Sequence, residues 1–360
     1  MTPPLDQDRP RIEALTFTRF VAAAAIVVFH FGRKAAPFDG ELMGALVKKG
    51  YVGVSYFFIL SGFVMIVAYG HKDRVAVRPY LRNRFARIYP VYVLAIAMLF
   101  CVRSLQSQAI DWTGVGLNLL LVQAWIPDYA HSFNMPGWSL SCEMAFYAAF
   151  PWLYNSVYRR FYLRRVGIAA LVLWAVSQVV FHALLWSPLY GGLHSTGHNA
   201  ILYFPLMHFN QFILGNIVGL LYLQRRGAGR GNHDLALVAL VAAVAVVPPL
   251  ITAVNWHNGL LAILFVPAIL LTAANTGPIA RVSSLRPFVF LGEISYGIYI
   301  LQLPVFEGCE VAFDRWGLED PSLRFYAFAL VLLAISVLSY IALEAPLRRW
   351  IKSRGTRAPS

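Results

Sequence analysis

The chain has 360 residues, of which 59% are hydrophobic and 13% charged, and its formal net charge is +13. Soluble domains carry about 25% charged residues, so this composition excludes an ordinary soluble protein and indicates a polytopic membrane protein. In so apolar a chain, basic residues mark cytosolic loops beside the anionic leaflet, and we expect no nucleic-acid partner. The three cysteines are far apart, which favours neither a disulfide framework nor a metal site.

Apolar runs long enough to cross a bilayer recur along the chain. A helix of roughly 18 or more apolar residues can span the hydrocarbon core. We predict an all-α bundle of about ten transmembrane helices, forming a single integral membrane domain over residues 1–360 with no fused soluble domain. The spans are expected near 12–31, 50–69, 88–106, 138–157, 166–185, 199–223, 235–252, 256–274, 287–306 and 322–344.

The basic residues predict the orientation of these spans. Of the 30 Lys and Arg residues, 22 fall on one side and 7 on the other, with Arg19 inside a span. The side rich in Lys and Arg is cytosolic, so both termini are expected in the cytosol. We expect the protein to be a multi-pass protein of the inner (plasma) membrane. Segment 109–125 would reverse every later loop if it crossed, so we interpret it as an interfacial or re-entrant element on the outer side.

The first span, "TRFVAAAAIVVFHF" (18–31), contains two ionisable residues. An α-helix turns about 100° per residue, so the eleven steps from Arg19 to His30 place both on one face, about 16 Å apart. Ionisable groups at this depth face the bundle interior or a wet cavity. One interpretation pairs Arg19 with a buried carboxylate and leaves His30 at the interface. The other is a polar pathway that ends at His30, which can exchange a proton near neutral pH.

Two later stretches carry polar residues near the predicted second and third spans. "GYVGVSYFFILSGFVM" (50–65) contains Ser61 among small residues, a pattern that favours helix packing. "RNRFARIYP" (82–90) places Arg84 and Arg87 three residues apart at the expected cytosolic mouth, with Pro90 in the first turn of the following span. The two arginines fit either a positive-inside anchor or a clamp for phosphate groups.

Further polar residues lie in two predicted spans. "WSLSCEMAFYAAFPWLY" (138–154) contains Glu143, a membrane carboxylate that needs a cationic partner, for which Arg19 is the obvious candidate. The additional candidate site residues are Trp138 and Ser139 in the same stretch, and Ser295, Tyr296 and Gln302 in the predicted span 287–306. "LEAPLRRW" (343–350) ends the last span.

The ordered set of these stretches resembles the acyltransferase 3 family of integral membrane acyltransferases, which modify polysaccharides and other glycans. The stretches that carry it are "LTFTRFVAAAAIVVFHF", "GVSYFFILSGF", "RNRFARIYP", "WSLSCEMAFYAAFP", "LGEISYGIYILQLP" and "EAPLRRW". The resemblance implies that Arg19 and His30 form the family's intramembrane Arg-x10-His, and that Arg84 and Arg87 form its cytosolic Arg-x-x-Arg. It further implies a cytosolic acyl-CoA donor, acetyl-CoA being the expected one, and an acceptor hydroxyl on the outer face.

The chain departs from the family pattern at two points. Gln302 stands where relatives often have a histidine, so a second histidine base has no counterpart here. Many relatives also carry a fused SGNH-type domain, which 360 residues do not include.

The chemistry of the reaction needs a group that takes a proton from an alcohol, and His30 is the best candidate for it. The catalytic set is therefore His30, Arg19 and Glu143, with Arg84 and Arg87 binding the donor; whether His30 is itself acylated stays open. His194 and His198 are four residues apart but make a weak metal case. The main rival is a transporter or flippase of a glycan or lipid precursor. Such proteins often show internal repeats, and this chain shows none.

Overall fold

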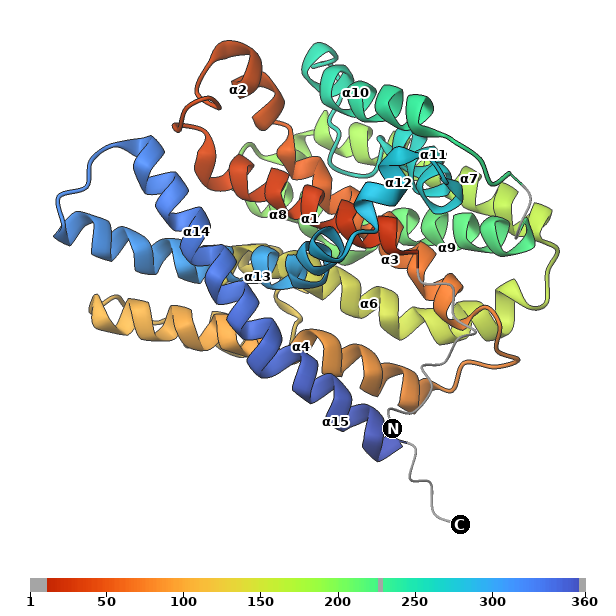
Figure 1. The fold of residues 1–360 in the computed structure, drawn as a ribbon, viewed down its shortest axis with the longest axis horizontal. Helices are drawn as coiled ribbons and strands as arrows, with labels where there is room; N and C mark the ends of the chain where they lie inside the picture. The colour runs from red at the N-terminus through yellow and green to blue at the C-terminus, as the bar shows by residue number, and fades with distance from the viewer. Residues whose placement is uncertain (1–11, 226–228, 356–360) are drawn as a thin grey trace.

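A computed structural model of the protein describes residues 12–225 and 229–355, with only the backbone described for 352–355. The described chain is helical throughout (Figure 1). Its α-helices are α1 (Glu13–Val27), α2 (Glu41–Val47), α3 (Gly53–Tyr69), α4 (Val77–Leu105), α5 (Trp112–Leu119), α6 (Trp138–Trp152), α7 (Leu163–Leu185), α8 (Thr196–Tyr203), α9 (Phe209–Gln224), α10 (Asp234–Leu250), α11 (Ala262–Ala274), α12 (Pro278–Ser283), α13 (Arg286–Arg315), α14 (Pro321–Ser339) and α15 (Ala345–Gly355).

Seven helical segments of the described chain are long and apolar enough to cross a membrane. They are Glu13–Gly32, Glu41–Tyr69, Val77–Leu105, Leu163–Leu185, Thr196–Gln224, Arg286–Arg315 and Pro321–Ile351. The all-α membrane bundle is therefore confirmed, but the number ten is not. The expected cytosolic ends, 1–11 and 356–360, lie outside the described residues.

Three expected spans account for the difference in number. Span 235–252 forms a 17-residue helix that ends just after Pro248 and Pro249, and 256–274 forms a helix of only 13 residues. Span 138–157 forms α6 and a following π-helical turn, but Ser139, Ser141 and Glu143 lower its hydropathy. Segment 109–125, by contrast, contains only the eight-residue α5 and short turns. Eight residues reach about 12 Å, which fits the expected interfacial or re-entrant element.

The position of Pro90 corrects a second expectation. We expected Pro90 in the first turn of a span, but α4 begins at Val77 and carries Pro90 in its interior. Proline removes one backbone hydrogen bond from a helix, and membrane helices tolerate this because neighbouring groups compensate. Arg84 and Arg87 therefore lie on the body of a long helix rather than before it.

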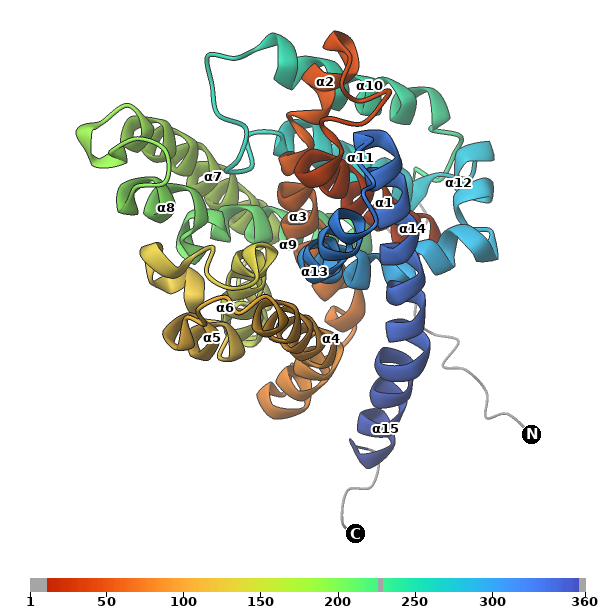
Figure 2. The same ribbon diagram turned by 90° about the vertical axis from the view of Figure 1, so that its left-hand side faces the viewer.

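Helix α13 lies at the centre of the bundle and contacts α1, α4 and α14 (Figure 2). Glycines allow two of the helix pairs to approach closely. A Cβ atom on Gly292 of α13 would lie 1.9 Å from the carbonyl oxygen of Thr16 in α1, and one on Gly62 of α3 would lie 2.2 Å from that of Phe212 in α9. The small residues of "ILSGF" thus pack helices, as the sequence favoured, and α1 is fixed against α13.

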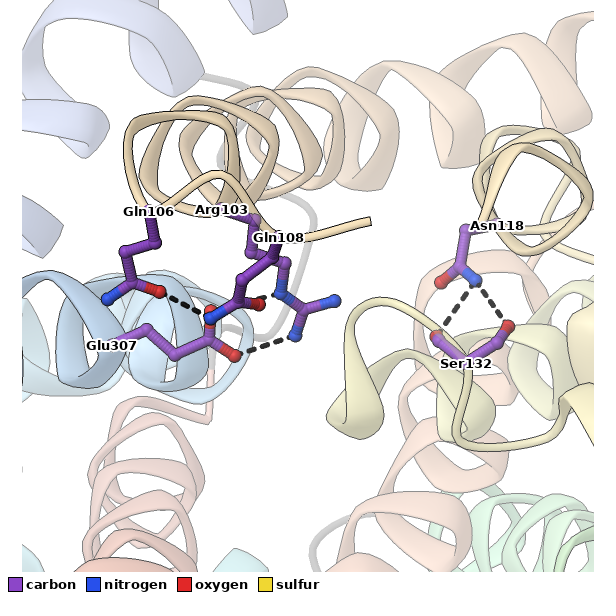
Figure 3. A network of polar contacts seen from close by, with 6 residues as sticks. All are labelled: Arg103, Gln106, Gln108, Asn118, Ser132 and Glu307. Carbon is purple, nitrogen blue, oxygen red and sulfur yellow. Dashed lines mark hydrogen bonds and ion pairs between the residues drawn. The ribbon is translucent and has the colours of Figure 1, made fainter. Parts of the chain in front are cut away.

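A buried polar network holds the segment between α4 and α6 (Figure 3). Asn118 is fully buried; it accepts a hydrogen bond from the hydroxyl of Tyr92 at 2.8 Å and donates to the carbonyl and hydroxyl oxygens of Ser132 at 2.9 and 3.0 Å. Nearby, Arg103 of α4 forms two hydrogen bonds, of 3.0 and 2.6 Å, to the carboxylate of Glu307 in α13. These contacts fix the connection between α4 and α6 and hold α4 against the central helix α13.

Replacing Asn118 by leucine should destabilise the protein. The Tyr92 hydroxyl would lose the acceptor of its own proton, although it still accepts from Gln123 Nε2, and the half-buried Ser132 would lose its donor. An unsatisfied buried polar group costs about 1–3 kcal/mol, so we expect a loss of about that size. Thermal unfolding in detergent micelles measures it. Gln106→Leu is the matched control, because Gln106 is exposed and bonds only Gln108. Equal unfolding temperatures for the two variants would contradict the structural role of Asn118.

Candidate active site

A cavity of about 360 Å³ lies between α1, α3, α4, α6, α13 and α15. Helices α4 and α15 contact each other, and we call the end of the bundle formed by residues 70–78 and 345–355 the basic end. The polar residues of the cavity wall are Thr16, Arg19, Ser61, Arg87, Ser139, Glu143, Tyr147, Glu293, Ser295, Tyr296, Tyr299 and Arg348. Most of the remaining wall is apolar and comes from α3, so the cavity can hold both a charged group and an apolar chain.

Three guanidinium groups, of Arg19, Arg87 and Arg348, face two carboxylates, of Glu143 and Glu293, across this cavity. Within the wall itself one positive charge is in excess, and Glu344, which is buried outside the wall, interacts with the same three arginines. Guanidinium groups bind phosphate and carboxylate with paired hydrogen bonds. A cluster of this kind inside an apolar bundle is costly unless water or a ligand solvates it.

Arg19 and Glu143 line the same cavity, but none of the ion pairs among the described residues joins them. The hydroxyl of Tyr147 instead donates a hydrogen bond to Glu143 Oε2 at 3.3 Å, and Ser61 Oγ donates to the Tyr147 hydroxyl at 3.4 Å. The direct pair that the sequence led us to expect is thus absent among the described residues, and Tyr147, one turn along α6, is the hydrogen-bond partner of the carboxylate. The two charges act on each other through the cavity.

The two arginines of "RNRFAR" separate into different environments. Arg87 lines the cavity, whereas Arg84 does not. The guanidinium of Arg84 lies over the rings of Tyr69 and Tyr80, at 5.8 and 6.0 Å from their centroids, and its Nε is buried without a hydrogen-bond partner among the described residues. Arg87 is therefore the member of the pair that can touch a ligand, and Arg84 packs behind it.

The hydroxyl of Tyr299 belongs to the cavity wall next to Ser139. Ser139 Oγ lies 2.8 Å from the Tyr299 hydroxyl, and both hydroxyls hydrogen-bond the carbonyl oxygen of Pro136. The ring of Phe57 contacts that of Tyr299 at 5.8 Å. These three side chains close this part of the cavity.

His30 lies outside the cavity wall, in a π-helical turn, Val28–Gly32, that follows α1. Turns of this type occur often at functional sites. Its Nδ1 is 2.9 Å from Gln302 Oε1, and Gln302 Nε2 donates to the carbonyl oxygen of Tyr299 at 2.7 Å. Because the amide nitrogen of Gln302 is used on Tyr299, its oxygen accepts from His30 Nδ1–H. Nε2 of His30 then carries the free lone pair that a general base needs.

The structure thus brings most of the candidate residues to two neighbouring places. Arg19, Ser61, Arg87, Ser139, Glu143, Ser295 and Tyr296 line the cavity, and His30 with Gln302 lies beyond Tyr299. Arg84 and Trp138 lie apart from the wall. Sequence reasoning missed Arg348, Tyr147 and Tyr299. Tyr147 could have been found from its i, i+4 spacing to Glu143. Arg348 could not be told from the basic residues that follow a span on its cytosolic side.

The comparisons with known proteins agree with this geometry. The model of the acyltransferase 3 family, an acyltransferase domain, matches residues 12–341, and the chain belongs to that family. It is an O-acyltransferase embedded in a membrane, which decides against the transporter or flippase. No solved structure matches the chain.

Curated relatives include named acyltransferases. Acyltransferase MdmB of Streptomyces mycarofaciens is 30% identical over 96% of this chain and 93% of its own length. The exopolysaccharide production protein ExoZ of Rhizobium meliloti is 27% identical over 88% of this chain and 96% of its own. The O-acetyltransferase OatA of Staphylococcus aureus is 20% identical over 92% of this chain but only 56% of its own length.

Replacing Gln302 by leucine should lower acyl transfer while leaving donor binding unchanged. The leucine cannot accept from Nδ1–H, so the imidazole loses both its orientation and its tautomer. Loss of a partner that orients a functional histidine typically costs about 10–100-fold in activity. Transfer rates in nanodiscs measure the effect, with Gln108→Leu at an exposed glutamine as the control. Unchanged turnover in Gln302→Leu would remove Gln302 from the site.

Proposed function

We propose that this protein transfers an acetyl group from cytosolic acetyl-CoA to a hydroxyl of a cell-surface glycan or glycolipid at the outer face of the inner membrane. The observation that carries the proposal is the arrangement of two sites on one helix pair. An arginine-lined cavity begins at the basic end, and Tyr299 is part of the wall of this cavity. The carbonyl of Tyr299 accepts a hydrogen bond from Gln302, and the side-chain oxygen of Gln302 is the partner of His30.

The charge and shape of the cavity support acyl-CoA as the donor. Coenzyme A carries phosphates at one end and, at the other, a slender pantetheine arm with two amide groups that ends in the thioester. Arg87 and Arg348 suit the phosphates, and the apolar wall from α3 suits the arm. The basic loops beside this end indicate that it faces the cytosol, where acyl-CoA is available.

The position of His30 supports its role as the general base. The acceptor hydroxyl gives its proton to His30 Nε2 while its oxygen forms a bond to the acyl carbon. The carbon–sulfur bond then breaks, and the thiolate of coenzyme A leaves and takes up the proton. Arg19, with its permanent charge, lies about 16 Å along the helix from His30 and therefore holds the donor or orders Glu143 instead of acting on the reacting carbonyl.

The names of the relatives support the acyl group and the acceptor class. OatA is named an O-acetyltransferase, and ExoZ is named for exopolysaccharide production. We extend these to the present chain as acetyl transfer to a glycan hydroxyl.

Arg87→Ala should weaken acetyl-CoA binding by about 10–100-fold, because a hydrogen bond to a charged group contributes about 1.5–3 kcal/mol. Binding is measured by isothermal titration of the protein in nanodiscs. Arg82→Ala is the control, since Arg82 is exposed on the same helix and loses the same charge. If both variants bind the donor as tightly as the parent, the cavity is not the donor site.

His30→Ala should lose at least about 10²-fold in transfer, within the range that general-base catalysis contributes. It should bind acetyl-CoA with the affinity of the parent, because His30 does not line the cavity. Mass spectrometry of cell-surface glycans, with and without the variant, measures transfer in cells. Transfer within a few-fold of the parent would show that His30 is not the base.

A further inference from the structure

A group of aromatic side chains lies on the side of the bundle near His30, away from the basic end. Tyr203 at the end of α8 is its centre. The ring of Tyr203 lies 4.0 Å from that of His131, 5.0 Å from Trp138 and 5.5 Å from His257, centroid to centroid. The rings of His257 and Trp138 are stacked at 5.4 Å. His131, Tyr203 and His257 are half-buried, so this ring cluster keeps accessible surface.

The ring cluster is connected to His30 through two intervening rings, those of Tyr51 and Phe29. The ring of Tyr51 stacks on His257 at 5.8 Å and contacts Phe29, the neighbour of His30, at 5.6 Å. His30 is also among the groups whose charge lowers the pKa of His131. A ligand on the ring cluster can therefore present a hydroxyl to His30.

Two buried polar atoms in this region have no hydrogen-bond partner among the described residues. They are Oδ1 of Asn134 and Nδ1 of His257. Asn134 is fully buried, and its amide nitrogen donates to the carbonyl oxygen of Ile300 at 3.3 Å, two residues before Gln302. An unsatisfied buried polar group destabilises the protein, and a ligand with hydroxyl groups would supply both a donor and an acceptor.

The cluster is uncharged although it is rich in histidine. Burial, followed by the charges of His198, His30 and His194, lowers the pKa of His131 to about 4, so His131 is neutral at physiological pH. The titratable groups that act on His257 are also histidines, and no carboxylate among them stabilises an imidazolium. In the described part of the chain, no group of three or more His, Cys, Asp or Glu side chains could hold a metal ion.

We propose that the ring cluster of His131, Trp138, Tyr203 and His257, together with Asn134, binds the sugar ring of the acceptor, and that this ring is uncharged. The inference rests on the proposed function for its reaction and adds where the acceptor binds and what class it is. Aromatic faces pack against the C–H faces of a pyranose, and the neutral imidazole and amide groups bond its hydroxyls. A carboxylate-bearing sugar would find no cation in the cluster to offset its charge.

Saturation-transfer NMR on the whole protein in nanodiscs tests binding without any requirement for turnover. The probes are the methyl α-pyranosides of glucose, galactose and mannose, and the methyl glucuronide as the anionic counterpart. At least one uncharged pyranoside should receive saturation from the parent protein, and the glucuronide should receive less. If no uncharged pyranoside binds, or if the glucuronide binds best, the proposal is wrong.

Variants at Tyr203 connect the binding to the ring cluster. Tyr203→Leu should weaken the pyranoside by about 2–12-fold, which corresponds to the roughly 0.5–1.5 kcal/mol of an aromatic contact, whereas Tyr203→Phe should bind like the parent. Trp316→Leu removes an aromatic ring that is 75% exposed on another loop and should change nothing. Parental sugar affinity in Tyr203→Leu would overturn the proposal.

Acetyl-CoA titration separates failure of this inference from failure of the proposed function. Tyr203→Leu should bind the donor like the parent, which also shows that the variant folds. If the parent binds pyranosides through the ring cluster but never transfers acetyl to any acceptor, the proposed function fails and the sugar site stands. If it transfers acetyl while Tyr203→Leu shows the parental KM for the acceptor, the site fails alone.

Discussion

The cost of placing guanidinium groups inside an apolar bundle is the constraint on which the rest of this structure depends. Arg19, Arg87 and Arg348 are each too expensive to bury in hydrocarbon alone. They are tolerated because six helices leave a cavity into which all three project, with Glu143 and Glu293 on its wall. At Gly62 and Gly292 the absence of a side chain lets α3 pack closely on α9 and α13 pack closely on α1. The cavity thus lies beside tightly packed helix pairs.

The same constraint explains why the arginine-lined cavity and His30 are separated. A cationic cavity suits the phosphates of a donor, but a histidine beside several guanidinium groups would be disfavoured in its charged form, which forms during general-base catalysis. His30 lies beyond Tyr299, in the π-helical turn, and its partner is the neutral Gln302. Tyr299 connects the two places, because its hydroxyl is part of the cavity wall and its carbonyl fixes the amide that orients the imidazole.

Sequence reasoning predicted the fold class and more than half of the polar residues of the cavity wall, because both depend on local patterns. Apolar runs mark the spans, and polar residues within them mark the interior, as for Arg19, Ser61 and Glu143. It did not predict which residues make direct contact. The pair of Arg19 with Glu143 is replaced by a hydrogen bond from Tyr147, and Arg84 turns to Tyr69 and Tyr80. Such choices depend on side-chain packing between helices, which no single segment encodes. The sequence analysis also did not predict the π-helical turns, because the helical projection of Arg19 and His30 assumed an α-helix throughout.

Gln302 shows how a departure from a family pattern can preserve a function. A histidine at this position would be a second titratable group beside His30, able to accept or donate depending on its tautomer. Glutamine cannot titrate, and with its amide nitrogen on Tyr299 its oxygen can only accept. The hydrogen bond to His30 Nδ1 therefore keeps one direction at every pH. A single base with one fixed tautomer is sufficient for the transfer, because the same proton can pass from the acceptor hydroxyl to Nε2 and on to the departing thiolate.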